Sequence, residues 1–264
     1  MKKLLIVLLA LTLALAFVGC GKQAPSATPE SAMESTETEA PADTVDVKSE
    51  GVMTYAEYAA AELDTEVVIE AYVQAKQSWW DNTATVYAQD QDGAYFLSNM
   101  ACTEEQYETL TPGAKIRVTG YKAEWSGEIE IIDATFELLE GNYIAAPVDV
   151  TTLLGTDELI QHQNKFVSFT GMTVVAAGQD EDGNDVPFLY NHDGSGQDGN
   201  DLYFKVEKDG QVYTFTVESY LCDNTTEVYA AVKNLAIGDT VNMEGFLYWY
   251  EGVNPHITAV SVAQ

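Results

Sequence analysis

Basic residues are scarce in this chain. Its 264 residues contain 12 Lys plus Arg against 42 Asp plus Glu, which gives a formal net charge of −30. A surface of this sign repels phosphate backbones and anionic lipid headgroups. The composition therefore disfavours nucleic acid as a partner, and it also fits an acidic, solvated surface that has no specific partner.

Cysteine and histidine are equally sparse, with three residues of each. There is no C-x-x-C, and His162, His192 and His256 do not have the spacing of metal ligands. The chain also has no G-x-S-x-G and no Gly-rich phosphate loop. We therefore expect no catalytic residues, no cofactor and no metal site, and we interpret the chain as a non-enzyme.

Residues 178–201 are rich in Asp, Asn and Gly, a composition that is also found in calcium-binding loops. An EF-hand loop needs acidic groups at positions one, three and five, Gly at six and Glu at twelve. A loop starting at Asn191 would have Leu202 at position twelve, and one starting at Asp180 would have its Gly at position four. We expect a solvated loop rather than a calcium site.

One long apolar run is present, at the start of the chain. Lys2 and Lys3 precede residues 4–18, which are apolar apart from Thr12, and Gly19 and Cys20 follow. So short a run behind a basic start is typical of a secretory signal rather than a membrane-spanning helix. An ordinary secretion signal with an incidental cysteine is one interpretation.

The small residue before Cys20 resembles the lipobox of bacterial lipoproteins. That resemblance implies removal of a signal peptide, residues 1–19, and a thioether-linked diacylglycerol on Cys20. The mature chain would then be extracytoplasmic and anchored to the cell membrane. Residues 20–50, rich in Ala, Pro, Ser, Thr and Glu and without aromatic residues, are predicted to form a disordered acidic tether.

The rest of the chain contains a repeat. GAKIRVTGYKAEWSGEIEIIDA (113–134) and GDTVNMEGFLYWYEGVNPHITA (238–259) match at a spacing of 125 residues. The matched pairs are Gly113 and Gly238, Ile116 and Val241, Val118 and Met243, Gly120 and Gly245, Gly127 and Gly252, Ile132 and Ile257, and Ala134 and Ala259. We interpret this as one strand pair built twice, in domains spanning residues 51–143 and 146–264.

Hydrophobic alternation and turn residues predict the same order of elements in both copies. Copy one has a helical lead-in at 55–63, strands at 67–75, 83–89 and 94–99, a helix at 103–110, a strand around Ile116 and Val118, and a strand at 127–138. Copy two has strands at 166–175 and 212–218, a helix at 225–234, and strands at 239–249 and 253–262. Cys102 and Cys222 each follow a third strand, so we expect both to be buried and unpaired.

Three strands, a helix and two strands, with the pattern G-x-x-[IV]-x-[VM]-x-G, resemble the OB-fold. The predicted fold is mainly β, with two tandem five-stranded OB-fold-like Greek-key barrels, each with a short helix between strands three and four. An immunoglobulin-type sandwich is the alternative, but it needs about seven strands per unit. The OB-fold resemblance implies little about function, because the fold hosts many ligands.

Aromatic residues gather at two predicted turns, after strand one and between strands four and five, which flank the ligand groove in an OB barrel. Their faces suit sugar rings, nucleobases or a partner's side chains. Alternatively, Trp79 and Trp125 pack on each other and cap the barrel mouth. The predicted ligand-binding residues are Trp79, Trp80, Tyr121, Lys122, Trp125, Tyr248, Trp249 and Tyr250.

These observations favour a monomeric, lipid-anchored binding module without catalysis, whose ligand is a neutral glycan or a peptide. Single-stranded nucleic acid is an alternative ligand, for which Lys76, Lys115, Arg117 and Lys122 form the available basic cluster. A structural or assembly role, with an envelope protein as partner, is the third hypothesis.

Overall fold

The computed structural model describes residues 48–263, which lie in one compact unit. The predicted signal segment, Cys20 and the tether up to residue 47 lie outside these described residues. Over residues 48–263, no helix has the length and apolar character needed to span a membrane.

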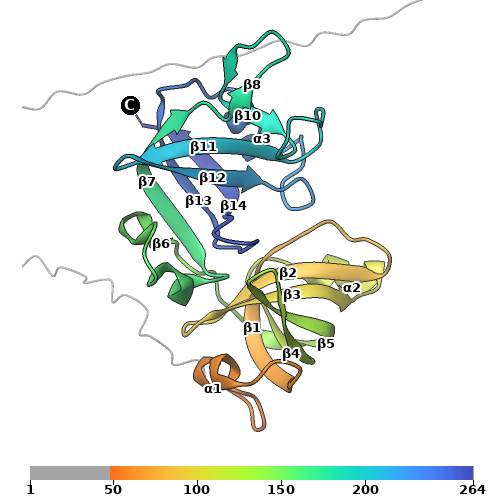
Figure 1. The fold of residues 1–264 in the computed structure, drawn as a ribbon. Coiled ribbons are helices and arrows are strands. Elements are labelled where there is room, and N and C mark those ends of the chain that lie inside the picture. Colours follow the sequence, from red (N-terminus) through yellow and green to blue (C-terminus); the bar gives the residue numbers. More distant parts are fainter. Residues whose placement is uncertain (1–47, 264) are drawn as a thin grey trace, which may run out of the picture. The chain divides into compact units, whose positions relative to one another are not determined.

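The first barrel is a closed ring of five strands in the order β1-β2-β3-β5-β4 (Figure 1). All its strand pairs are antiparallel except β3 with β5. Its elements are α1 (Tyr55–Ala60), β1 (Glu66–Lys76), β2 (Thr83–Gln89), β3 (Ala94–Ala101), α2 (Glu104–Thr109), β4 (Ala114–Trp125) and β5 (Glu128–Asn142). The helix between strands three and four is therefore present where the sequence predicts it.

The second barrel repeats this ring. Its strands follow the order β11-β12-β14-β13-β7, and the pairing of β11 with β7 closes it. Its elements are β7 (Phe166–Val175), β11 (Leu202–Lys208), β12 (Gln211–Val217), α3 (Glu227–Lys233), β13 (Thr240–Phe246) and β14 (His256–Val262). Two tandem OB-fold-like barrels are thus confirmed.

The remaining elements connect or decorate the barrels. Between them lie β6 (Val148–Asp149) and the 3-10 turns η1 (Thr151–Leu153) and η2 (Leu159–His162). The Asp/Gly-rich insert of the second barrel forms β8 (Gly178–Gln179), β9 (Asp185–Val186) and β10 (Phe188–Tyr190). Within residues 48–263, no three His, Cys, Asp or Glu side chains are grouped so as to hold a metal ion.

Each element follows from local chemistry. Val67, Ile69, Ala71 and Val73 alternate along β1 and are buried inside the barrel. Helices α1 and α2 each begin with a capping box, at Thr54 and Thr103. Cys102 and Cys222 are buried free thiols, as predicted.

Lys48, which falls within the predicted tether, contacts the first barrel. Its Nζ donates to the Glu70 carbonyl and to Asp90 Oδ2, each at 2.7 Å. The Asp90 side chain is buried, and Lys48 supplies a compensating positive charge.

The sequence repeat matches the glycines but not every core position. The pairing register shifts beside Gly120 in β4 and beside Gly245 in β13. The inward isoleucine of β5 is Ile131, whereas Ile132 is only half-buried. Ile132 therefore does not take the core position of Ile257, because the two strand pairs differ in register: Ile116 lies opposite Leu138, whereas Val241 lies opposite Val262. Copy two's strands four and five are also shorter than predicted, ending at Phe246 and starting at His256.

Aromatic side chains join the two barrels. Tyr87, on the outer face of β2, stacks on Phe246 with ring centroids 4.3 Å apart, and its Oη lies 2.8 Å from His256 Nδ1. Phe96 of β3 contacts Tyr248, with ring centroids 5.1 Å apart. Tyr87, Phe96, Phe246 and Tyr248 form one buried cluster, called here the inter-barrel cluster. It covers the outer face of β2 and β3 in the first barrel.

A buried carboxyl lies at the same junction. Glu128 Oε2 accepts from the Trp249 backbone N–H at 2.8 Å and from Gln163 Nε2 at 3.2 Å. Its Oε1 is buried and has no hydrogen-bond partner among the described residues. Burial raises the pKa of Glu128 to about 8, although hydrogen bonds from Asn164, Trp249 and Gln163 lower it in part. The protonated form is the one that suits this environment.

We expect Gly120→Ala to destabilise the fold by about 2 kcal/mol or more. A Cβ at this position would lie 2.7 Å from Ile131 Cγ2 and 2.8 Å from the Ile132 carbonyl oxygen, and the latter is backbone that cannot yield easily. Urea unfolding monitored by circular dichroism measures the change. Gly183→Ala is the control, since open space surrounds its Cβ and only its positive φ is strained. Equal losses in the two variants would contradict the close packing at Gly120.

We also expect Glu128 to make stability fall as pH rises. In the unfolded chain this carboxyl ionises near its ordinary pKa of 4.5, whereas in the folded protein it keeps its proton until about pH 8. Its contribution is full below pH 4.5 and is lost as the pH rises through 8, with a total of roughly 5 kcal/mol. Glu218, whose pKa burial raises to about 7, acts in the same direction, whereas burial lowers the pKa of His256 to about 3, which costs stability at acid pH.

Urea unfolding across pH 4.5–9 tests this for the wild type and for Glu128→Gln. The variant should show a shallower fall, because the amide cannot ionise. Glu124→Gln removes an exposed carboxylate from the neighbouring strand and should leave the slope unchanged. Parallel pH profiles for Glu128→Gln and the wild type would contradict the assignment.

Candidate functional site

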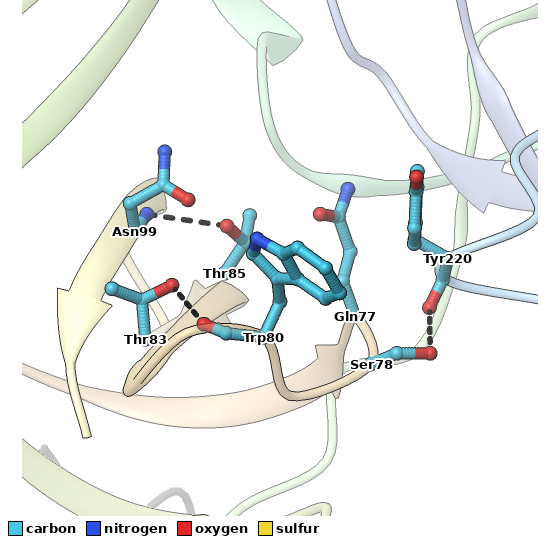
Figure 2. A pocket seen from close by; sticks show the side chains of 7 residues that line it. All are labelled: Gln77, Ser78, Trp80, Thr83, Thr85, Asn99 and Tyr220. Atoms are coloured by element: carbon cyan, nitrogen blue, oxygen red, sulfur yellow. Dashed lines mark hydrogen bonds between the residues drawn. The ribbon is translucent and has the colours of Figure 1, made fainter. Parts of the chain in front are cut away.

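A pocket of about 190 Å³ opens beside the loop between β1 and β2. Seven residues line it: Gln77, Ser78, Trp80, Thr83, Thr85, Asn99 and Tyr220 (Figure 2). Six come from the first barrel, and Tyr220 comes from the turn after β12 in the second. We call this the Trp80 pocket.

A tight turn places Trp80. The backbone groups of Trp80 and Thr83 bond to each other in both directions, and Asp81 and Asn82 between them have φ values of 46° and 62°. Two left-handed residues in a two-residue hairpin define a type I′ turn, which Asp and Asn tolerate. The turn leaves Trp80 74% exposed, with its indole beside the Gln77 side chain (Figure 2).

The second barrel completes the pocket through Tyr220. The Ser78 backbone N–H and Oγ both donate to the Tyr220 carbonyl, at 2.7 and 3.1 Å. Glu218 fixes the turn from the other side by accepting from the Tyr220 and Leu221 N–H groups at 3.2 and 2.9 Å. The ring of Tyr220 is 63% exposed. The Trp80 pocket thus depends on the packing of the two barrels.

The pocket lining is uncharged. It offers two aromatic rings, four hydroxyl groups including the phenol of Tyr220, and two carboxamides, in a chain whose formal net charge is −30. Burying a charged ligand group here would leave it without a counter-ion from the lining. The pocket therefore suits a ligand that is neutral and has both an apolar face and hydrogen-bonding groups.

The adjacent tryptophans predicted to bind together have different surroundings. Trp79 is half-buried, and its Nε1 donates to the Cys102 carbonyl at 2.8 Å. It anchors the loop, and the pocket is lined by Trp80 alone of the pair. Trp125 is not among the residues that line this pocket.

Lys122, a predicted ligand contact, is engaged within the first barrel. It is buried, and its Nζ donates at 2.8–3.1 Å to the carbonyls of Tyr58, Ala59 and Ala61 at the end of α1. A lysine there satisfies carbonyls that have no partner within the helix. Its neighbour Tyr121 is exposed, with its Oη 3.5 Å from Glu66 Oε2.

The other predicted aromatic residues lie where the barrels meet. Trp125 is 52% exposed and its ring contacts Tyr250, with centroids 5.1 Å apart. Tyr248 is buried in the inter-barrel cluster, and Trp249 is half-buried and bonded to Glu128. The copy-two turn therefore packs on the first barrel instead of forming a second open mouth. The alternative pairing of Trp79 with Trp125 is also absent from the ring contacts of the described residues.

The basic cluster considered for nucleic acid is engaged internally. Lys76 Nζ donates to the Tyr107 carbonyl at 2.6 Å and lies over the Tyr107 ring. Lys115 and Arg117 both pair with buried Glu70, at 3.3 and 3.0 Å. With Lys122 held by α1, all four cations contact carbonyl or carboxylate groups of the protein itself.

No family model matches the chain, and no curated protein matches it in sequence. Similar solved structures include the tetrameric p202 HIN2, with 11% identity, a TM-score of 0.31 and coverage of 77% of this chain and 96% of that one. A murine DNA-binding protein bound to double-stranded DNA has 9% identity, a TM-score of 0.35 and coverage of 75% and 96%. The Ifi202 HINa domain in complex with 20-bp double-stranded DNA has 9% identity, a TM-score of 0.34 and coverage of 76% and 96%. Likenesses at these TM-scores carry no conclusion about what this chain binds.

Proposed function

We propose that this chain is a lipid-anchored extracytoplasmic binding protein that holds a neutral ligand, a glycan or a peptide, in the Trp80 pocket. The observation that carries the proposal is the uncharged, aromatic lining of that pocket in a strongly acidic chain. Exposed aromatic rings next to hydroxyl and amide groups are typical of sites for uncharged ligands.

Binding rather than turnover is the role we assign to the pocket. Apart from the phenol of Tyr220, its lining contributes no group that commonly transfers a proton to or from a ligand: no carboxylate, imidazole, amine or thiol. The hydroxyl groups of Ser78 and Thr83 donate to the carbonyls of Tyr220 and Trp80, and no basic group of the lining activates them.

Anchoring is supported by the sequence of the first 20 residues. A basic start, a short apolar run and Gly19-Cys20 resemble a lipoprotein signal, and the following acidic residues would hold the barrels away from the membrane. A binding protein presented in this way samples ligands outside the cytoplasm.

Single-stranded nucleic acid is the second candidate, because Trp80 and Tyr220 are exposed rings on which bases can stack. The electrostatic part of such binding has less support, since Lys76, Lys115, Arg117 and Lys122 are all engaged within the protein. An envelope-assembly role would instead use a protein partner on the same surface.

Trp80→Ala should abolish or weaken ligand capture at least tenfold, because it removes the largest exposed apolar face of the pocket. Residues 48–263, which contain both barrels, would be screened against arrays of neutral oligosaccharides, peptides and single-stranded oligonucleotides. Titration calorimetry would then measure the affinity for each ligand found. Trp125→Ala is the matched control, an exposed tryptophan outside the pocket, and it should bind like the wild type. Equal binding by Trp80→Ala and the wild type would rule out this site.

Cys20→Ser should release the protein from the membrane fraction. The wild type should partition into the detergent phase of Triton X-114 and carry the added mass of a lipid on its first mature residue. The variant should partition into the aqueous phase. An unlipidated wild-type chain that begins at another residue would contradict the anchor without affecting the pocket.

A further inference from the structure

We infer that the ligand of the Trp80 pocket is a carbohydrate, one sugar ring of which stacks on the Trp80 indole. This inference rests on the proposed function and narrows its ligand from a glycan or peptide to a neutral sugar. Several hydrogen-bonding groups of the pocket already have partners within the protein, and those that remain limit which ligands it can bind.

The backbone of the pocket is unavailable to a peptide. The Gln77 N–H bonds to the Thr85 carbonyl, the Ser78 N–H bonds to the Tyr220 carbonyl, and Trp80 and Thr83 bond to each other. A peptide that is captured as an extra strand gains its affinity from main-chain hydrogen bonds along an open edge. Here those bonds are made within the protein, so recognition falls to side chains.

The three aliphatic hydroxyls of the pocket present a mixed set of acceptors and donors. Thr83 Oγ1 donates to the Trp80 carbonyl at 2.7 Å and Ser78 Oγ donates to the Tyr220 carbonyl at 3.1 Å, which leaves their oxygens as acceptors. Thr85 Oγ1 accepts from the Asn99 backbone N–H at 3.2 Å, so its proton is available to donate. Figure 2 shows these three bonds around the pocket.

Two carboxamides extend this set, since Gln77 and Asn99 each carry a carbonyl oxygen and an NH₂ group. Neighbouring sugar hydroxyls act as donors and acceptors at once, and a carboxamide can bond to both members of such a pair. A nucleobase or an apolar side chain offers fewer groups to this set. The lining matches a polyol better than either.

The aromatic residues supply the apolar half of recognition. A sugar ring has a face of C–H groups, which packs on the negative face of an indole while its hydroxyls point outward to polar partners. Trp80 exposes its ring next to the Gln77 side chain, and Tyr220 lies at the other side of the pocket (Figure 2). The cavity of about 190 Å³ is of a size for a single ring, so a longer glycan would extend into solvent.

The experiment titrates ¹⁵N-labelled protein with methyl glycosides of neutral hexoses and N-acetylhexosamines, with alanine and leucine tripeptide amides, and with nucleosides. The readout is the Trp80 indole N–H signal, which is assigned by its loss in Trp80→Phe. A glycoside should shift this signal saturably, and tripeptides and nucleosides should not.

Variants separate stacking from hydrogen bonding. Trp80→Phe should keep part of the affinity for the glycoside, Trp80→Ala should lose at least tenfold, and Gln77→Ala should lose severalfold. Trp125→Ala should match the wild type. Because Trp80 and Gln77 lie outside the buried cores, thermal unfolding of each variant checks that the fold is intact.

The outcomes are distinct. A saturable shift with tripeptides or nucleosides but with no glycoside would overturn the sugar inference and leave a neutral-ligand site standing. No shift with any of the three classes, on these probes and on the oligosaccharide array, would overturn both the inference and the proposed function.

Discussion

The stacking of Tyr87 on Phe246 is the interaction on which the rest of this structure depends. It joins two barrels that could each close without the other, and it brings the outer face of β2 and β3 against β13 and β14. Burying the Tyr87 ring requires a partner for its hydroxyl, which is His256, and the buried Glu128 carboxyl accepts from the Trp249 backbone N–H. The junction is therefore specific in orientation as well as apolar.

That junction decides which surfaces remain for a ligand. In the first barrel it covers the β2–β3 face, which in OB barrels commonly contacts ligands. The junction also buries Tyr248 and part of Trp249. The position of these residues between strands four and five predicts a binding loop. At the rim of the same junction it brings Tyr220 to the loop that carries Trp80, where the Ser78 N–H and Oγ bond to the Tyr220 carbonyl. The Trp80 pocket is thus a product of barrel packing.

The sequence predicts most of the scaffold because its signals are local. β2 and β7 have the predicted boundaries, and Thr103 caps α2 as its side chain suggests. The core residue of β5 is Ile131 rather than Ile132, and this depends on the register in which β4 and β5 pair, so spacing alone misses it. The site is less predictable still. Trp80 is recognisable as a turn tryptophan, but Tyr220 is 140 residues away in the chain and meets it only through the junction. The sequence alone also does not reveal that the Lys122 ammonium donates to three carbonyl groups at the end of α1.

Hydrogen exchange of the Ser78 amide tests the central claim most directly, since this N–H donates across the barrels to Tyr220. The adjacent Gln77 amide is an internal reference, because its partner, Thr85, lies in the same barrel. The account predicts that both amides are protected in the wild type, and that Phe246→Ala releases Ser78 while Gln77 stays protected. A Ser78 amide that exchanges freely in the wild type, next to a protected Gln77, would show that the barrels do not hold the pocket together.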